Sequence, residues 1–585
     1  MCGIFGMIGD GAQGNTLQAL KLLEYRGYDS AGIAVKRQDG IHIYKSEGRI
    51  QNLEKLLPQD VHCKVAIGHT RWATHGAVST ENAHPFYSPD KRFAVVHNGI
   101  IENYQALKKQ FTLRGAVFTS QTDSETVAHL LQNNYSGNVL GAVLATANNL
   151  VGSFAIAITT AYDDNLYAIK NKSPLVIGMS DSGVYLCSDI RCVSHWADRV
   201  AVAPDKTVVV ATAHGVYFYD FDGNPIKVHY FTPEKAEKEQ PVDGDFMLKE
   251  IHEIPSKIRL AKSEYFNCGG LKLEAERVKR FTRIYLIGCG TAYNSGLQIA
   301  AVARKLLDVD IVPIIASEFI YDSYPVDDNT LTLLISQSGE TADTLAAAKL
   351  AKDQGAYLAA ITNVAYSSLT RLADCVLETR AGAEIAVAAT KSFNAQLAVL
   401  FMLANLRAGV KENFSELSHL AKDTLSVSEN VRSWTPYFLS AKSVYFIGRG
   451  IDYCVALEGS LKLKEISYLP SEGYAAGELK HGTLALVDEK TPVVAILTQR
   501  TLAEKTMNAV HETRSRGARV FLITTLPEVI QNCEATASIL IPACTELFSP
   551  VLSVIPLQAL AYYTALARGN DPDKPRHLAK SVTVE

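Results

Sequence analysis

One sequence pattern occurs twice in this chain, 160 residues apart, and it constrains the fold more than any other feature. Ile284-Tyr-Leu-Ile-Gly-Cys-Gly-Thr-Ala-Tyr293 and Val444-Tyr-Phe-Ile-Gly-Arg-Gly-Ile-Asp-Tyr453 each run from an apolar strand through Gly-x-Gly into a helix, with Tyr residues in register. Strands that alternate with helices predict a parallel sheet with helices on its faces. We therefore expect two tandem α/β domains, near residues 246–425 and 430–577, followed by a tail over 578–585.

These glycine turns do not complete the fingerprint of a dinucleotide-binding domain. The third Gly of G-x-G-x-x-G is replaced by Tyr293 in one copy and by Tyr453 in the other. That Gly normally lets the helix pack closely on the strand beside the pyrophosphate. The sequence predicts no cofactor.

The part of the chain before residue 230 has a different pattern. Short apolar runs such as Phe93–His97 and Phe154–Ile158 are separated by Gly, Asn and Asp, which is typical of strands and turns with few long helices. A charged stretch with Pro and Gly, residues 231–245, is predicted to be a linker. A chain of 585 residues is too long for one core, so we expect a separate domain over residues 2–230.

Composition excludes several classes of function. The net charge is −4 and the basic residues form no stripe, which argues against nucleic acid as a partner. The ten Cys residues include no Cys-x-x-Cys pair, so neither a disulfide framework nor a metal site is predicted. No signal peptide is evident, and the longest apolar run, Leu397–Leu406, is too short to span a bilayer. We expect a cytoplasmic protein that does not bind membranes.

Cys2 stands next to the first residue of the chain. If the initiator Met is removed, Cys2 carries a thiol and a free α-amine on the same carbon. An α-amine titrates at roughly 7.7–8.0 and a thiol near about 8.5. At neutral pH the amine can therefore take the thiol proton and hand it to a leaving group. The structural alternative is a buried Cys near the start of a strand.

Two further segments carry side chains suited to amide chemistry. Gly68–Gly76 packs two His, one Arg and one Trp into nine residues. In His97–Tyr104, Asn98 offers an amide donor and Gly99 an unobstructed backbone N–H, and two such donors can form an oxyanion hole. Taken singly, the first segment also fits a polar strand edge with a core Trp, and the second fits a turn.

A fourth motif, Thr122-Asp-Ser-Glu125, resembles a helix N-terminus capped by Thr122 or Asp123. With the Cys2 start, the motifs Arg-Trp-x-Thr-His-Gly, His-Asn-Gly and Asp-Ser-Glu resemble those of the N-terminal-nucleophile glutaminase domain of class II amidotransferases. The resemblance covers residues 2 to about 230 and implies a layered α+β sandwich.

The resemblance implies a role for each matched residue. Cys2 attacks the side-chain amide of glutamine, and Asn98 and Gly99 hold the oxyanion. Arg71 pairs with the α-carboxylate through its planar guanidinium, and Asp123 takes the α-ammonium. Thr74 and His75 line the site, Trp72 lies on its gate, and Arg26 supports it. The products are glutamate and ammonia.

A loop rich in hydroxyl groups follows an apolar strand in the first α/β copy. Leu333–Thr341 runs from the strand into Ser-Gln-Ser-Gly-Glu-Thr, and a helix is predicted from Ala342 to Ala351. Helix N-terminal N–H groups, the positive end of the helix dipole and hydroxyl donors suit a phosphate. A well-capped helix start is the alternative. The matching stretch of the later copy, Ala495–Thr501, lacks the pattern, so we expect only one copy to hold a phosphate.

Ser-Gln-Ser-Gly-Glu-Thr resembles the signature of sugar isomerase (SIS) domains, which bind phosphosugars. Two such domains behind a glutaminase resemble the glutamine–fructose-6-phosphate aminotransferase family over essentially the whole chain. The resemblance implies conversion of D-fructose 6-phosphate and L-glutamine to D-glucosamine 6-phosphate and L-glutamate. This reaction begins amino-sugar biosynthesis, and the ammonia is channelled from one site to the other.

The same resemblance assigns the residues of the sugar half. Lys580 forms a Schiff base with the open-chain ketone, and Glu465 moves a proton between C1 and C2. His481 of the partner subunit assists ring opening in a homodimer. The residues that bind the phosphate and sugar, or lie near them, are Ser336, Gln337, Ser338, Thr341, Thr291, Val387 and Lys462. By position alone, Lys580 would be a solvated tail residue.

Two residues depart from the pattern of the family, and several other functions are alternatives. Ala292 and Ala389 stand where many relatives have Ser, so each loses a hydroxyl near the phosphate. The alternatives are an amidotransferase that makes another amino sugar, a deglycase, a phosphoribosyl amidotransferase and a phosphosugar sensor. An intact Cys2 site disfavours the deglycase and the sensor, and we find no acidic pyrophosphate-binding loop for the third.

Overall fold

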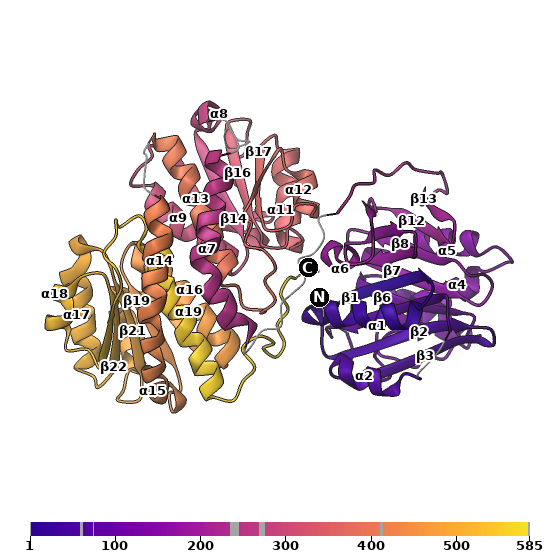
Figure 1. The fold of residues 1–585 in the computed structure, drawn as a ribbon, viewed down its shortest axis with the longest axis horizontal. Coiled ribbons are helices and arrows are strands. Elements are labelled where there is room, and N and C mark those ends of the chain that lie inside the picture. The colour runs from indigo at the N-terminus through magenta and orange to yellow at the C-terminus, as the bar shows by residue number, and fades with distance from the viewer. Residues whose placement is uncertain are drawn as a thin grey trace. The chain divides into compact units, whose positions relative to one another are not determined.

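The computed structural model describes residues 2–58, 62–73, 75–233, 245–267, 275–409 and 414–582. The chain divides into two compact units, residues 1–240 with 581–585 and residues 241–580 (Figure 1). Most of the predicted linker, and Thr74, lie outside the described residues.

The first unit contains two antiparallel sheets. The seven-stranded sheet has the order β11-β9-β10-β1-β4-β2-β3 and the six-stranded sheet the order β13-β12-β8-β7-β6-β5. The strands of the first sheet are β1 (Gly3–Gly9), β2 (Ser30–Arg37), β3 (Gly40–Glu47), β4 (Val65–Arg71), β9 (Val176–Ser180), β10 (Gly183–Cys187) and β11 (Arg199–Val202). Those of the second are β5 (Phe86–Tyr87), β6 (Phe93–Ile101), β7 (Gly152–Thr160), β8 (Leu166–Asn171), β12 (Thr207–Thr212) and β13 (Gly215–Asp220).

Helices cover the outer faces of the two sheets. They are α1 (Ala12–Leu23), α2 (Ile50–Leu56), α3 (Tyr104–Leu113), α4 (Glu125–Asn134), α5 (Val139–Asn149), α6 (Ile190–Val193) and the 3₁₀ turn η1 (Glu24–Arg26). Successive strand side chains point to opposite faces: Ile4 and Val96 lie between the sheets, whereas Phe5 packs with the α1 side and Val95 with the α4 side. The layered α+β sandwich is confirmed, although helices such as α1 are longer than the short-strand pattern indicated.

The second unit contains two five-stranded sheets whose paired strands are all parallel. The first has the order β15-β14-β16-β17-β18 and the second the order β20-β19-β21-β22-β23, which is the same order one copy later. The strands are β14 (Arg283–Gly288), β15 (Asp310–Ile315), β16 (Thr330–Ile335), β17 (Tyr357–Thr362), β18 (Cys375–Glu378), β19 (Val444–Gly448), β20 (Ser471–Ala475), β21 (Pro492–Leu497), β22 (Arg519–Thr524) and β23 (Ala537–Leu540). The sequence repeat is therefore a repeat of the fold.

Helices from both copies share one core. The helices are α7 (Phe246–Asn267), α8 (Ala275–Arg280), α9 (Thr291–Ala303), α10 (Ala316–Phe319), α11 (Ala342–Asp353), α12 (Ser368–Leu372), α13 (Lys391–Ala408), α14 (Phe414–Ser428), α15 (Thr435–Leu439), α16 (Ile451–Ser467), α17 (Ala503–Arg514), α18 (Pro527–Cys533) and α19 (Ser549–Ala567). The 3₁₀ turns are η2 (Glu429–Trp434), η3 (Glu478–His481), η4 (Thr483–Leu486) and η5 (Arg500–Leu502). Leu286, Phe393, Phe446 and Leu557 belong to a single buried cluster, so the two copies fold against each other through α9, α13, α16 and α19 (Figure 1).

The glycine turns have the same backbone geometry in both copies. Gly290 precedes α9 with φ 53° and ψ −124°, and Gly450 precedes α16 with φ 57° and ψ −123°. Positive φ is readily available only to Gly. The turn that the repeat predicted thus recurs with matching conformation at the start of matching helices.

The longest apolar segment is not the one that the sequence pattern indicated. Helix α19 spans 19 residues and is long and apolar enough to cross a membrane by length and composition, but 83% of its apolar window is buried. The sequence pattern did not indicate the full length of this apolar helix, because polar residues such as Ser553 and Gln558 interrupt its apolar residues. Both are fully buried in the structure. Its burial is that of a core helix of a folded domain.

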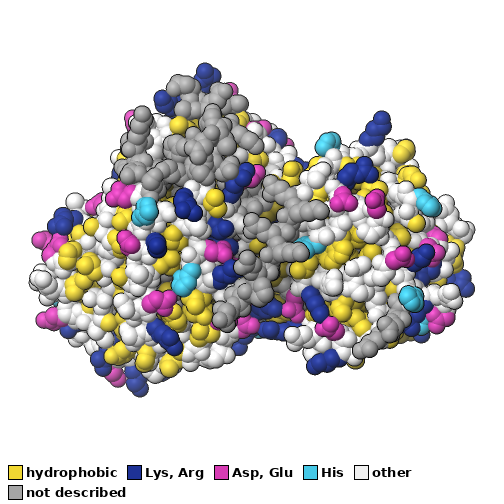
Figure 2. Space-filling model, viewed as in Figure 1, with side chains coloured by type: hydrophobic (Ala, Val, Ile, Leu, Met, Phe, Trp, Pro, Cys, Tyr) yellow, Lys and Arg dark blue, Asp and Glu magenta, His cyan; other side chains and the backbone are white. Residues whose placement is uncertain are grey.

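Charged side chains of both signs are mixed over the face drawn in Figure 2. The chain carries 57 Lys and Arg residues against 61 Asp and Glu, which leaves a net charge of only −4. Interspersed charges of this kind are typical of ordinary solvent-exposed surfaces.

Candidate active sites

Cys2 lies where the start of β1 meets the end of β4. Gly3 is paired with Thr70, and the Gly3 N–H donates to Thr70 Oγ1 at 3.1 Å. The Trp72 N–H donates to Cys2 Sγ at 3.3 Å. Burial raises the pKa of the Cys2 thiol, although the Trp72 N–H and the charge of Arg71 act in the opposite direction. The thiol therefore needs a base before it can act as a nucleophile.

Asn98 and Gly99 reach this point from β6 in the other sheet. The side-chain amide of Asn98 donates to the Cys2 carbonyl at 3.0 Å. Gly99 has φ 125°, and a Cβ there would lie 1.9 Å from the carbonyl oxygen of Ser153. Only Gly fits this position, which explains the Asn-Gly pair. The fold thus brings Asn98, a predicted oxyanion donor, to the predicted nucleophile.

A buried histidine, His69, orients Asn98, a role that the sequence analysis did not assign to it. His69 Nε2 lies 2.9 Å from the His97 carbonyl and 3.0 Å from Asn98 Oδ1. Because a carbonyl oxygen only accepts, Nε2 must carry the proton and donate. Its donation to Oδ1 turns the amide N–H₂ of Asn98 toward Cys2. Burial lowers the pKa of His69 to about 3, so the ring is neutral.

A second histidine, His84, extends this series of hydrogen bonds. His84 Nδ1 lies 3.0 Å from His69 Nδ1. Since neutral His69 is protonated at Nε2, its Nδ1 accepts and His84 Nδ1 must donate. Burial, with the neighbouring His69 and His97, holds the pKa of His84 well below its usual range. Both tautomers are therefore dictated by their partners. The only sequence signal was the two His residues of Gly68–Gly76, of which His69 is one.

Arg71 ends β4 and is 3% exposed. Its guanidinium donates to the carbonyls of His75, Gly76 and Ala77, which holds the loop after β4 in place. The ring of His75 contacts Tyr104 edge-on, with centroids 5.5 Å apart. Trp72 is half-buried in the same loop.

Asp123 accepts two hydrogen bonds but does not cap a helix. Its Oδ2 accepts from the Ile101 N–H at 2.8 Å, and the Ser124 hydroxyl donates to Oδ1 at 3.2 Å. Helix α4 begins at Glu125 with Ser124 as its N-cap residue, and no side-chain cap hydrogen bond is formed. The predicted cap by Thr122 or Asp123 is wrong, because β6 offers Asp123 a backbone N–H from outside the helix.

Arg26 is buried in a charged cluster. Its Nη2 is 2.8 Å from Asp189 Oδ2, and Arg191 pairs with the same oxygen at 3.4 Å. Burial alone would raise the pKa of Asp189, but Arg191 and Arg26 hold it well below the usual range. Tyr25 donates its hydroxyl to the same carboxylate. Arg26 therefore supports the fold through an ion pair that stays charged.

In the second unit, the Ser336–Thr341 loop joins β16 to α11. The hydroxyls of Ser336 and Thr341 lie 3.0 Å apart, and the Gly339 N–H donates to Ser336 Oγ at 3.1 Å. The Glu340 N–H donates to Ser338 Oγ at 3.1 Å, while Gln337 is half-buried between them. Thr341 is the N-cap residue of α11 but makes no side-chain cap bond. The hydroxyls therefore gather in the loop instead of capping the helix.

A buried ionic cluster lies between α9 and α16. Lys462 Nζ is 2.6 Å from Glu465 Oε2 and 3.5 Å from Glu458 Oε1, and it donates to Thr291 Oγ1 at 2.9 Å. Burial raises the pKa of Glu458 to about 7, although Lys462 acts in the opposite direction. Burial would lower the pKa of Lys462, but Glu465 and Glu458 outweigh it and raise the value. The cluster unites three predicted residues, and Glu458 was missed although it stands one turn before Lys462.

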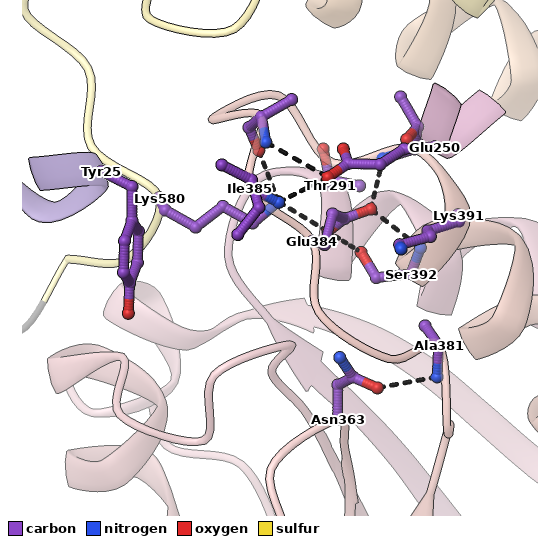
Figure 3. Close-up of polar contacts among 12 residues, drawn as sticks. Tyr25, Glu250, Thr291, Asn363, Ala381, Glu384, Ile385, Lys391, Ser392 and Lys580 are labelled. Atoms are coloured by element: carbon purple, nitrogen blue, oxygen red, sulfur yellow. Dashed lines mark hydrogen bonds and ion pairs between the residues drawn. The ribbon is translucent and has the colours of Figure 1, made fainter. Parts of the chain in front are cut away.

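Lys580 is not solvated: its side chain is 4% exposed. Its Nζ lies 2.6 Å from Glu384 Oε2 and donates to the Ala386 carbonyl at 2.8 Å (Figure 3). Burial would raise the pKa of Glu384, but Lys580 and hydrogen bonds from Ser392 lower it to about 2. Lys580 and Glu384 therefore form a buried ion pair. The charge of Glu384 also raises the pKa of Lys462, so the two clusters lie within electrostatic range.

Two predicted residues are not members of these ionic clusters. Val387 follows Ala386, and its N–H donates to the carbonyl of Asp573 at 3.0 Å. His481 ends the 3₁₀ turn η3 and is exposed. Among the described residues, no group of His, Cys, Asp and Glu is arranged to hold a metal ion.

Comparison with known proteins places both units in described families. Residues 69–195 match the model of a glutamine amidotransferase domain, and residues 279–406 and 437–568 each match the SIS domain. The second unit resembles the solved C-terminal domain of glucosamine-fructose-6-phosphate aminotransferase from Francisella tularensis, with TM-score 0.53 and 34% identity, over 56% of this chain and 98% of that one. The protein is thus a glutamine amidotransferase joined to a tandem pair of SIS domains.

Full-length relatives specify the family. The chain is 41% identical to glutamine–fructose-6-phosphate aminotransferase (isomerizing) of Clostridium tetani and 42% identical to that of Symbiobacterium thermophilum. Both alignments cover 100% of each protein. The chain belongs to the glutamine–fructose-6-phosphate aminotransferase (isomerizing) family, as its motifs predicted.

Proposed function

We propose that this aminotransferase makes glucosamine 6-phosphate from fructose 6-phosphate and glutamine through two half-reactions, one in each unit. Family membership over the full length of the chain carries the proposal. The arrangement of Asn98 against Cys2 and of Lys580 in a buried ionic cluster supports the division of labour. A sensor or a deglycase has no use for a glutaminase site.

In the glutaminase half, Cys2 attacks the side-chain amide carbon of glutamine. The α-amine that Met1 removal exposes takes the thiol proton and passes it to the departing ammonia. Asn98 and Gly99 stabilise the oxyanion, and water then cleaves the thioester to release glutamate. Arg71 and Asp123 bind the α-carboxylate and α-ammonium. The other predicted residues keep the roles that the resemblance implied: Trp72 as a gate, Thr74 and His75 as lining, and Arg26 as support.

His69 acts as a positioning residue in this half. It touches no substrate, but its N–H fixes which end of the Asn98 amide faces Cys2. An amide turned the other way would present an oxygen to the developing negative charge, which would destabilise the transition state. A neutral ring with a dictated tautomer holds the orientation across the physiological pH range.

In the sugar half, the hydroxyl loop of Ser336, Gln337, Ser338 and Thr341 binds the phosphate, with Thr291 and Val387 beside the sugar. The amine of Lys580 attacks the ketone in its neutral form, because an ammonium has no lone pair. Attack on C2 and loss of water form the Schiff base. Ammonia then attacks the imine carbon C2 and displaces the lysine amine, which leaves an imine of the sugar and frees Lys580. Glu465, paired with Lys462, moves a proton from C1 to C2 to give the amino sugar.

The assembly and location of the protein remain proposals from the family resemblance. We propose a cytoplasmic homodimer in which His481 of the partner subunit assists ring opening, and in which ammonia passes between the sites without release to solvent. The exposure of His481 is compatible with this role.

Replacement of Cys2 by Ala tests the division into halves. The variant should lose glutamine-dependent synthesis and keep thermal stabilisation by fructose 6-phosphate, because the sugar residues all lie in the second unit. Loss of that stabilisation in the folded variant would contradict the division. An intact-mass spectrum that showed Met1 retained in active enzyme would exclude the α-amine as base.

A further inference from the structure

One residue position distinguishes the two SIS copies where a phosphate would bind. Ala292 is the second residue of α9, and Asp452 is the second residue of α16. The preceding glycine turns have matching backbone angles, so the two side chains leave equivalent backbones. One copy carries a methyl group at this position, and the other carries a carboxylate.

The carboxylate of Asp452 is bound by the loop of its own copy. Its Oδ2 accepts from the Thr498 N–H at 2.9 Å and its Oδ1 accepts from Thr498 Oγ1 at 2.5 Å. The neighbouring Gln499 also favours the ionised form of Asp452. Burial raises the pKa of Asp452, whereas these donors act in the opposite direction. Backbone and hydroxyl donors at the C-terminal end of a parallel strand are the groups that hold a phosphate in proteins.

The loop that binds Asp452 is the counterpart of the hydroxyl loop in the first copy. Thr498 is the first residue after β21, as Ser336 is after β16. Burial differs between them: Asp452 is 2% exposed and Gln499 1%, whereas Gln337 and Thr341 are half-buried and reach the surface. The second loop is thus closed over a carboxylate, whereas these two residues of the first loop are partly exposed.

We propose that Asp452 is a built-in anion that occupies the phosphate position of the second SIS copy, so that a phosphosugar can enter only the first. The inference rests on the proposed function for the location of the phosphate in the first copy. It explains why a duplicated fold carries one sugar site: the Asp452 side chain fills the second loop, so an incoming phosphate would find no room there, besides meeting a like charge in a desolvated position.

Phosphate binding by Asp452→Ala tests the proposal. Equilibrium dialysis of the full-length protein with inorganic phosphate should give one phosphate per chain for the wild type and two for Asp452→Ala. Asp452→Asn, which keeps the volume but not the charge, is the matched control and should still give one. Without phosphate, Asp452→Ala should melt at a lower temperature than the wild type, and phosphate should restore part of the loss. A folded Asp452→Ala that binds no more phosphate than the wild type overturns the proposal.

The reciprocal substitution keeps the test decisive if Asp452→Ala does not fold. Ala292→Asp places the carboxylate in the first copy and should weaken binding of phosphate and fructose 6-phosphate by roughly tenfold or more. Unchanged binding by Ala292→Asp overturns the equivalence of the two positions. If the wild type binds no phosphate and Asp452→Ala binds one, the proposed phosphate loop of the first copy is refuted, but the role of Asp452 is supported. If neither protein binds phosphate, the phosphate loop and the role of Asp452 are both refuted.

Discussion

Replacement of Glu250 by Gln should stabilise the second unit at neutral and alkaline pH. Glu250 lies in α7 and is 2% exposed. Its Oε1 accepts from the N–H groups of Ile385 and Ala386, and its Oε2 is buried without a hydrogen-bond partner among the described residues. Burial, and then the charge of nearby Glu384, raise the pKa of Glu250 to about 8 (Figure 3). A Gln keeps the carbonyl acceptor and cannot ionise.

The size and sign of the effect follow from the pKa. The value rises from 4.5 to about 8 on folding, and each pKa unit corresponds to about 1.4 kcal/mol, so the cost of folding reaches at most about 5 kcal/mol. Below pH 4.5 the carboxyl is neutral in both states, and the cost is absent. As the pH rises from there to about 8, the unfolded chain ionises while the folded one does not, and stability falls. Glu250→Gln should therefore gain stability over the wild type across this range.

Hydrogen exchange followed by mass spectrometry over α13 measures the opening free energy of this unit between pH 5 and 8. Glu384→Gln is the matched control with the opposite sign. The pKa of Glu384 is lowered from 4.5 to about 2, so its charge contributes about 3 kcal/mol above pH 4.5, and this is lost as the pH falls toward 2. The control should be destabilised at every pH of the range. A Glu250→Gln difference that does not change with pH would refute a neutral Glu250.

Three further predictions concern the proposed sites. His69→Phe should lower kcat for glutamine hydrolysis by roughly 10²-fold with little change in KM, whereas His69→Gln, which keeps an N–H donor, should retain more activity. If the loss caused by His69→Phe is additive with that of Asn98→Ala, His69 does not act through Asn98. Ser338→Ala and Thr341→Ala should each raise KM for fructose 6-phosphate by the equivalent of about 1–3 kcal/mol, and an equal fall in glutamine hydrolysis without sugar would mark the loop as structural. Borohydride with fructose 6-phosphate should trap an adduct on Lys580 in a peptide map, and normal synthesis by a protein truncated before residue 578 would exclude that lysine.

Local sequence patterns determined the layers and the repeat. The Gly-x-Gly turns at 288–290 and 448–450, and the strands that precede them, could be predicted because strand period and positive φ depend on a few neighbouring residues. The motifs around Cys2, Asn98 and Ser336 were specific enough to identify the family.

Predictions from local sequence patterns were wrong where a side chain binds a partner that is distant in the sequence. Asp123 resembled a cap, but a backbone N–H of β6 binds it instead. Helix α19 was overlooked because its polar residues look solvated in the sequence, while the fold buries them.

Only the tertiary structure decided the charge states and orientations at the sites. Lys580 pairs with Glu384, 196 residues away; His69 orients Asn98 across two sheets; and Asp452 fills a loop 46 residues further along. Each depends on which residues the packing of separate elements brings within hydrogen-bond distance, and on how completely it excludes water. A sequence shows which groups can ionise or donate, but burial and partners decide which of them do.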